Sequence, residues 1–112
     1  MCYNHIGEIM IEYNNRKYEV KMCTNLFNRF KGLMLKKEIK EILCFPKCNS
    51  IHTFFMFKTI DVIMTDKSGK ILYIFKNIKP WKIVLPKKNV YYTFELEPNY
   101  INFKINEKIK VL

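Results

Sequence analysis

The stretch SIHTFFMFKTIDVIM, from Ser50 to Met64, decides the fold of this 112-residue chain. It is almost entirely apolar, and its aromatic and β-branched residues favour extended strands. Its two halves, 51–57 and 60–65, are largely apolar on both faces when read with a period of two, which predicts a pair of central strands covered on both sides. Asp61 is the one carboxylate in the stretch. Because a buried carboxylate without partners costs several kcal/mol, Asp61 must accept backbone N–H bonds or pair with a cation.

Asp61 poses the main functional question of this sequence. The basic residues that could pair with it are Arg29, Lys58, Lys79 and Lys82. On one interpretation, Asp61 is a satisfied buried group that sets a turn or a strand register. On the other, it lies at the mouth of a pocket and orients a ligand or a basic side chain. The sequence leaves both interpretations open.

The rest of the chain predicts further short strands around this central pair. A hairpin is expected at 7–13 and 17–23, with its turn at Asn14-Asn15, because Asn tolerates left-handed backbone. The segment DKSG, from Asp66 to Gly69, has the residues of a β-turn. Additional strands are expected at 42–45, 70–75, 89–95 and 108–112, and a helical turn at 99–103.

One short helix is expected near residues 24–31, with Thr24 as its N-cap and Gly32 at its end. The strands do not alternate with helices in a βαβ pattern. The sequence therefore predicts a mainly β fold, a single-domain sandwich or open barrel of short strands with this one helix. The domain is expected to span residues 1–112, with the hairpin at about 7–23 as part of the same fold.

Composition excludes several classes of protein. Apolar residues make up 49% of the chain, yet no apolar run reaches the roughly 18 residues of a membrane-spanning helix. The N-terminus lacks a basic region followed by an apolar block, so we expect no signal peptide and a cytoplasmic location. The formal charge is +10, but the lysines are scattered and only Arg16 and Arg29 are arginines, which disfavours nucleic acid as a partner.

Neither a cofactor nor a metal is expected. The chain has three glycines and contains no dinucleotide-binding fingerprint, phosphate-binding loop or HExxH motif. Cys44, Cys48 and His52 could supply three metal ligands, but a structural zinc site needs four. The two cysteines are therefore predicted to be ordinary thiols beside a loop at Pro46. His52 has no visible nucleophile or base partner, and a packed or surface role is favoured for it.

Trp81, the only tryptophan, stands in the loop KPWK. A tryptophan in a polar loop either covers the core or forms a contact surface for a partner. Because tryptophan is highly buried on average, the sequence favours a lid over the core.

Four motifs occur in order along the chain: RFKGLM (29–34), IHTFFMFKTIDVIMTDKSGKI (51–71), KPW (79–81) and FELE (94–97). Together they resemble the prokaryotic family of domain of unknown function 192, from about Cys23 to the C-terminus. The resemblance implies a β-rich protein of similar length, with no established activity. The residues at its motif positions are Arg29, Gly32, Leu33, Met34, Met56, Asp61 and Trp81.

This chain departs from the family pattern at two turns. The family usually has an LELPxG step and a later Gly-Asp pair, whereas this chain has FELEPN, ending at Asn99, and then Asn106-Glu107. Asparagine can hold left-handed backbone, so the geometry of both turns is expected to survive. Ligand contacts through the amides of those glycines are not implied for this chain.

Three functions follow from these residues. The first is a non-catalytic binding or accessory module for a small ligand or a protein, with a cleft near Arg29, Met56, Asp61 and Trp81. The second is a hydrolase or lyase on an anionic or saccharide substrate, which needs Asp61 exposed in a pocket as general acid or base. The third is a basic nucleic-acid-binding β-barrel. The predicted ligand-binding residues are Arg29, Met34, His52, Met56, Asp61, Lys79 and Trp81.

Overall fold

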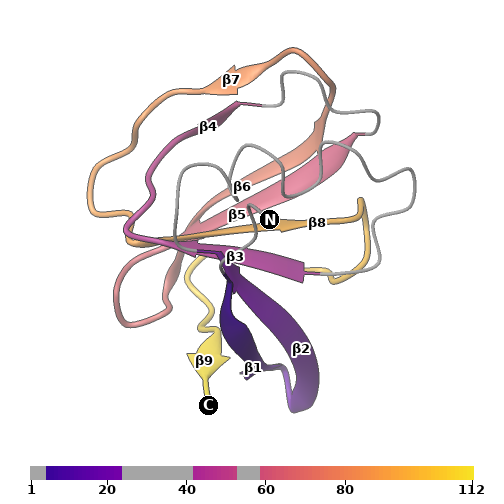
Figure 1. The fold of residues 1–112 in the computed structure, drawn as a ribbon, viewed down its shortest axis with the longest axis vertical. Helices are drawn as coiled ribbons and strands as arrows, with labels where there is room; N and C mark the ends of the chain where they lie inside the picture. The colour runs from indigo at the N-terminus through magenta and orange to yellow at the C-terminus, as the bar shows by residue number, and fades with distance from the viewer. Residues whose placement is uncertain (1–4, 24–41, 53–58) are drawn as a thin grey trace.

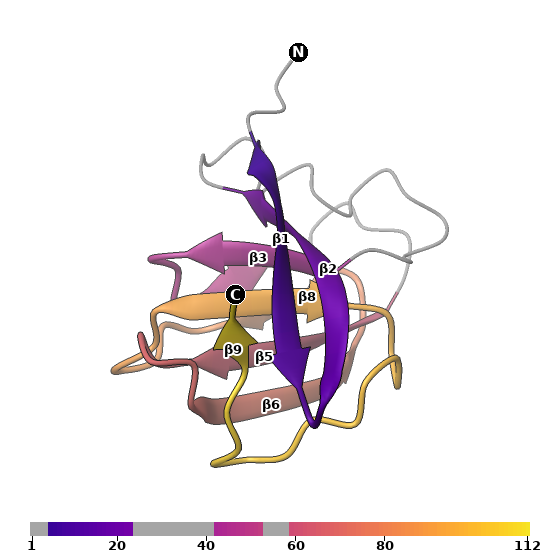
Figure 2. The ribbon, with the colours of Figure 1, turned by 90° about the horizontal axis from the view of Figure 1, so that it is seen from below.

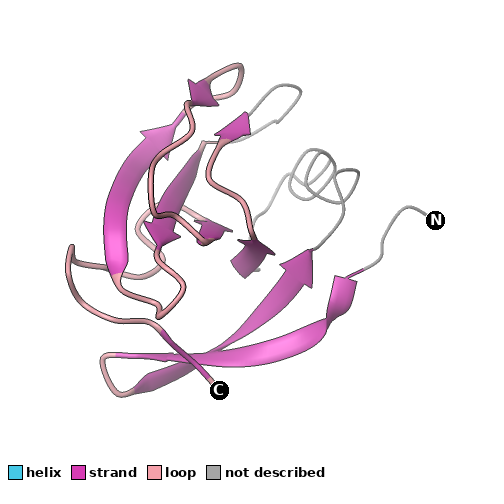
Figure 3. Cartoon of the chain, turned by 90° about the vertical axis from the view of Figure 1, so that its left-hand side faces the viewer, coloured by secondary structure: helices cyan, strands magenta, loops and turns pink. Residues whose placement is uncertain are grey.

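The computed structural model describes residues 5–23, 42–52 and 59–112. Figure 3 shows that the described part consists of strands and loops, which confirms the mainly β prediction. The helix predicted at 24–31 lies outside the described residues. The strands are β1 (His5–Tyr13), β2 (Arg16–Cys23), β3 (Ile42–Pro46), β4 (Ile51–His52), β5 (Ile60–Thr65), β6 (Ile71–Ile78), β7 (Ile83–Val84), β8 (Tyr92–Leu96) and β9 (Lys110–Val111).

Seven strands form one curled sheet, a half-barrel, in the order β6-β5-β8-β3-β2-β1-β9. The pairing of β2 with β3 is parallel, and the other strand pairs of this sheet are antiparallel. Figure 2 shows the β1–β2 hairpin running across the direction of β3, β8, β5 and β6. A second sheet, β4–β7, lies at the opposite end of the molecule from this hairpin (Figure 1).

Two core clusters cover the two faces of the large sheet. Alternate residues of each central strand point to opposite faces, so Ile63 of β5 joins one cluster while its neighbour Val62 joins the other. The first cluster includes residues of β1, β2 and the C-terminal segment, and the second includes Val84 of β7. All six residues of β5 are buried, which confirms the prediction of a central strand covered on both sides.

The predicted turns are present. Asn14 and Asn15 have φ angles of 55° and 67°, as a two-residue hairpin requires. In the turn from Asp66 to Gly69, the N–H of Gly69 donates to the carbonyl of Asp66 over 3.0 Å. Burial opposes ionisation of Asp66, but hydrogen bonds from the Ser68 side chain and from backbone N–H groups outweigh it and lower the pKa of Asp66.

Some predicted boundaries were wrong or incomplete. The strand expected at 89–95 runs from 92 to 96 instead, and 99–103 forms a turn and bend without helix. Only 51–52 of the strand expected at 51–57 is described, as β4. Its partner β7, with Ile51 opposite Val84, was not expected, because two residues are too few to show a strand pattern.

The C-terminal segment closes the first core cluster. The N–H of Ile109 donates to the carbonyl of Gly69 over 2.9 Å, and the N–H of Leu112 donates to that of Met10 over 2.9 Å. The hydroxyl of Tyr13 donates to Glu107 and accepts a 2.9 Å bond from the N–H of Lys104. These contacts join the first hairpin to the last twelve residues of the chain, so the two ends of the sequence share one core.

Stability is expected to fall between pH 10 and pH 12 because of Tyr13. Burial, followed by the hydrogen bond to Glu107, raises the pKa of Tyr13 to about 12, so the folded state holds the proton more tightly than the unfolded chain. The stabilisation is complete below pH 10 and lost as the pH rises through 12, a change of about 2 kcal/mol. Urea unfolding of the wild type and of Tyr13→Phe measures it. The free-energy difference between them should shrink over this range, and a constant difference would contradict the assignment.

Candidate functional site

Asp61 is buried, with 1% of its surface exposed. The N–H of Asn77 donates to its Oδ1 over 2.8 Å, and the N–H of Asn99 donates to its Oδ2 over 2.9 Å. The ammonium of Lys76 lies 3.3 Å from Oδ2. The carboxylate therefore joins the end of β6 to the turn after β8.

The cation that the structure describes beside Asp61 is Lys76, which was not among the four that the sequence suggested. Lys76 also donates to Oδ1 of Asn99 over 3.1 Å, and its side chain remains 38% exposed. Arg29 and Lys58 lie outside the described residues. Lys76 escaped sequence analysis because it lies on β6 across from Asp61, at the register shift between Ile60 and Val62 of the β5–β6 pair, and that register cannot be read from the sequence.

Both asparagines that replace family glycines hold left-handed backbone. The φ angle is 61° at Asn99 and 72° at Asn106, which confirms that the turns keep their geometry. Asn77, the other backbone donor to Asp61, has a φ angle of 57°. The carboxylate thus holds two backbone kinks in place.

Replacing Asn99 by Ala is expected to lower the free energy of unfolding by about 1 kcal/mol, because alanine is disfavoured at a positive φ. Asn99→Gly should stay within about 0.5 kcal/mol of the wild type, since glycine removes only the exposed bond to Lys76. Urea unfolding followed by circular dichroism would measure both variants. Equal losses for the two would show that the side chain, not the backbone conformation, is what matters here.

A groove of about 630 Å³ lies between the edge of β6 and β7, next to Lys76 and Asn77. No carboxylate is among the described residues that line it. Four of them are lysines, and most of the others are apolar. The lining residues are Ile74, Phe75, Lys76, Asn77, Ile78, Lys79, Lys82, Ile83, Val84, Leu85 and Lys87.

Trp81 does not cover the core, so the lid prediction was wrong. Its side chain is 59% exposed, and its φ angle is 67°, which is unusual for a bulky residue. Ile83 and Leu85, two and four residues later, are 57% and 66% exposed. Ile83 and Leu85 are therefore exposed on either side of Val84, which packs in the core, and Trp81 is exposed in the turn before β7.

Three of the seven predicted site residues can be placed fully. Asp61 is buried behind the groove, Lys79 lines it, and Trp81 lies between Lys79 and Lys82 in the loop that leads into β7. For His52 the structure describes the backbone, which pairs with Ile83. The predictions for Arg29, Met34 and Met56 concern positions outside the described residues.

Sequence analysis did not predict the groove. It missed the lining residues Lys76, Ile83, Leu85 and Lys87, and it considered Lys82 only as a partner of Asp61. A signal was present in the segment KPWKIVLPKK, where apolar residues at alternate positions are bordered by lysines. The two residues of β7 are too few for that pattern to predict a strand, and the pattern cannot say whether the apolar side chains are buried or exposed.

Cys44 and Cys48 are buried and form no disulfide, and they pack in different core clusters. The thiol of Cys48 lies 3.0 Å from the carbonyl oxygen of Ser50. This agrees with their prediction as ordinary packed thiols. Within residues 5–23, 42–52 and 59–112, no group of three or more His, Cys, Asp or Glu could hold a metal ion, and no helix is long and apolar enough to cross a membrane.

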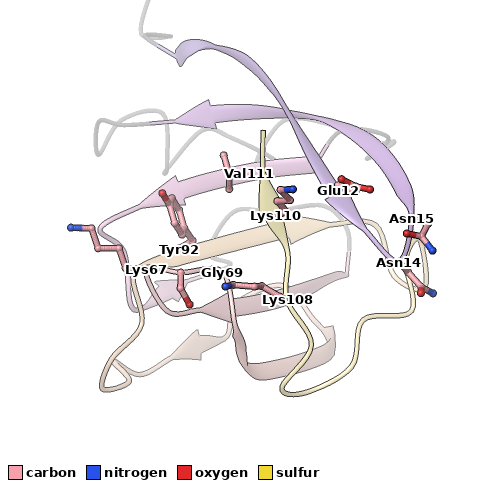
Figure 4. Close-up of a pocket in the computed structure, with 10 residues that line it drawn as sticks. Glu12, Asn14, Asn15, Lys67, Gly69, Tyr92, Lys108, Lys110 and Val111 are labelled. Atoms are coloured by element: carbon pink, nitrogen blue, oxygen red, sulfur yellow. The ribbon is translucent and has the colours of Figure 1, made fainter.

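A second cavity, of about 750 Å³, lies between the tip of the first hairpin, the Asp66–Gly69 turn and β9. Figure 4 shows Lys67 extending away from Lys108 and Lys110, while Glu12 lies near Lys110, its partner in the β1–β9 register. The positive charge of the second cavity is therefore dispersed and partly offset by Glu12. Among the described residues, the groove beside β6 is lined by four lysines, one of which, Lys76, pairs with Asp61, and by no carboxylate, whereas the second cavity is lined by three lysines and Glu12.

The fold and site together define a small β half-barrel with a basic groove at the edge of its sheet. The DUF192 family, described as Uncharacterized ACR, matches residues 9–111. The chain belongs to this family. The match begins within β1 rather than near Cys23, so the first hairpin is part of the family's domain.

Archaeal relatives carry the name UPF0127 protein. One from Thermococcus sibiricus is 35% identical over 80% of this chain and 64% of its own length. One from Thermococcus kodakarensis is 40% identical over 69% of this chain and 52% of its own length. One from Pyrococcus abyssi is 37% identical over 80% of this chain and 82% of its own length. The matched part of this chain thus spans only about half to two thirds of the two Thermococcus proteins.

Two solved structures share the fold. A protein of Sinorhizobium meliloti, named a "putative transcription regulator", has a TM-score of 0.78 at 13% identity and covers 99% of this chain and 96% of its own. A protein of unknown function from Novosphingobium aromaticivorans has a TM-score of 0.73 at 16% identity, over 92% and 83%. At these identities the likeness concerns the fold alone.

Proposed function

We propose that this protein is a non-catalytic binding module whose ligand occupies the groove between β6 and β7. The observation that carries the proposal is the composition of the groove, whose described lining residues include four lysines and six apolar residues but no carboxylate. Such a site favours a ligand that is both anionic and partly apolar, since apolar walls supply affinity and a few polar groups supply orientation. The buried thiols of Cys44 and Cys48, which form no disulfide, support a reducing compartment such as the cytoplasm for this role.

Asp61 supports the groove from behind. Its bonds to the N–H of Asn77 and to Lys76 involve two residues that line the groove. A site whose supporting residues are held by hydrogen bonds loses less conformational entropy when a ligand binds. Asp61 is thus a positioning residue in this proposal and does not touch the ligand.

The alternative of a hydrolase or lyase lacks support from the geometry. A general acid or base must reach its substrate, and Asp61 is 1% exposed with both oxygens accepting backbone N–H groups. The name of the Sinorhizobium meliloti protein raises the nucleic-acid alternative. None of the described residues that line the groove is an arginine, the residue that most often reads bases and phosphates in bidentate pairs.

Charge reversal at the groove tests the proposal. A thermal-shift screen of nucleotides, oligosaccharides, dicarboxylates and acidic peptides on the wild type should give at least one anionic hit. The double variant Lys79→Glu/Lys82→Glu should bind that hit at least about tenfold more weakly, because attraction becomes repulsion. Binding should also weaken as salt is raised.

The matched control is Lys67→Glu/Lys108→Glu, which makes the same change of charge at two exposed lysines of the second cavity. It should bind the hit as the wild type does. If this control loses binding and the groove variant keeps it, the ligand site is the second cavity and the proposal is wrong. A screen in which only single-stranded nucleic acid binds equally to both variants would also overturn it.

A further inference from the structure

The groove exposes the edge of a strand and not merely a face of a sheet. β6 is the terminal strand of the seven-stranded sheet, so β5 occupies one of its two edges. The groove is lined by six consecutive residues, from Ile74 to Lys79. Since successive side chains of a strand point to opposite faces, a cavity that touches consecutive residues lies along the strand edge.

The outer edge of β6 is covered by backbone at its start. There, the N–H of Ile71 donates to the carbonyl of Glu107 over 2.8 Å, and the N–H of Asn106 donates to the carbonyl of Ile71 over 2.9 Å. In the described part of the chain, no further segment is paired along that edge. An open strand edge is a template for another extended chain.

The opposite wall of the groove supplies side-chain contacts. Ile83 and Leu85 line it from β7 and are more than half exposed. Lys87 lies 5.8 Å from the ring centroids of both Tyr73 and Phe75, and those two rings are stacked 6.2 Å apart. These contacts keep a positive charge above the aromatic side of β6.

We infer that the ligand is an extended acidic segment of a partner protein, which adds to the edge of β6 as an extra strand. This inference rests on the proposed function. The main chain of the segment bonds to the β6 edge, its apolar side chains pack on Ile83 and Leu85, and its carboxylates face Lys79 and Lys82. Strand addition explains why an apolar wall, a row of lysines and an open edge occur together.

The probe is a capped heptapeptide of alternating Glu and Val, titrated against the whole chain. Binding is followed by the fluorescence of Trp81, the single tryptophan, which stands beside the groove. We expect saturable binding that weakens with salt and is lost in Lys79→Glu/Lys82→Glu but not in Lys67→Glu/Lys108→Glu. Two further peptides carry N-methyl groups on all Val or on all Glu residues.

N-methylation is the decisive comparison, because it removes the N–H groups of one strand edge at a time. In an extended peptide, the N–H groups of alternate residues point to the same side. We expect one methylated peptide to bind at least tenfold more weakly than the parent, and the other within about threefold. That asymmetry is the mark of main-chain pairing along one edge.

Other outcomes separate the inference from the proposed function. If both methylated peptides bind like the parent while the groove variant loses binding, the groove binds ligands but strand addition is wrong. If small anions bind at the groove and no peptide does, the inference fails and the proposed function stands. Light scattering gives a further check, since a concentration-dependent dimer that the peptide cannot dissociate would identify a second copy of the chain as the occupant.

Discussion

Asp61→Asn is expected to lower the free energy of unfolding by about 3 kcal/mol. The amide keeps the shape of the carboxylate but turns an NH₂ group toward one of two backbone donors, the N–H of Asn77 or that of Asn99. A buried donor left without an acceptor costs about 1–3 kcal/mol, and the mutation also removes the negative charge beside Lys76. That second contribution is small, because the lysine is 38% exposed.

Urea unfolding followed by circular dichroism is the measurement, since exposed Trp81 is a poor reporter of unfolding. The control is Glu97→Gln, which neutralises an exposed carboxylate in the same turn and should change stability by no more than about 0.5 kcal/mol. A loss below about 1 kcal/mol for Asp61→Asn would mean that the carboxylate is not structural. An exposed, functional role for Asp61 would then return to consideration.

Gly69→Ala is expected to destabilise the protein by about 3 kcal/mol as well. Gly69 has a φ angle of +96°, which disfavours any side chain, and a Cβ atom there would lie 2.1 Å from the carbonyl oxygen of Ile109. That oxygen belongs to the backbone and cannot rotate away. The C-terminal segment must therefore move away from the turn at Gly69. This breaks the hydrogen bond from the Ile109 N–H to the Gly69 carbonyl and exposes Ile109, which is fully buried.

Lys70→Ala is the neighbouring control, because the lysine is exposed and its backbone pairing to Lys108 does not depend on its side chain. It should stay within about 0.5 kcal/mol of the wild type in the same urea unfolding experiment. If Gly69→Ala were equally mild, the C-terminal segment could not be packed as closely on the Asp66–Gly69 turn as the structure shows.

Local patterns in the sequence were enough for most of the strands and for the central buried strand. Residues 60–65 are largely apolar on both faces, which predicted a strand covered on both sides, and all six are buried. The Asn14-Asn15 pair and the two asparagines that replace family glycines, Asn99 and Asn106, were predicted to hold left-handed backbone. Each of the four has a positive φ. These predictions succeed because strand period and turn conformation depend on a few neighbouring residues.

The candidate site was less predictable from sequence. The need of Asp61 for partners was clear, but Lys76 and the N–H groups of Asn77 and Asn99 could not be chosen without the strand register. Trp81 was expected to be covered and is 59% exposed. Average burial gives a poor guide for one residue, because exposure depends on whether another segment happens to lie over it.

The amino-acid sequence by itself determined a mainly β domain, the central strand with a carboxylate that needs partners, and the conformations of its turns, since these depend on local backbone preferences and hydrophobic patterns. Only the tertiary structure decided which segments meet. It placed β7 opposite β4, brought Asn99 to Asp61 across 38 positions of chain, and left most of the outer edge of β6 unpaired within the described residues, beside four lysines. Such long-range contacts depend on register and topology, which no local pattern encodes.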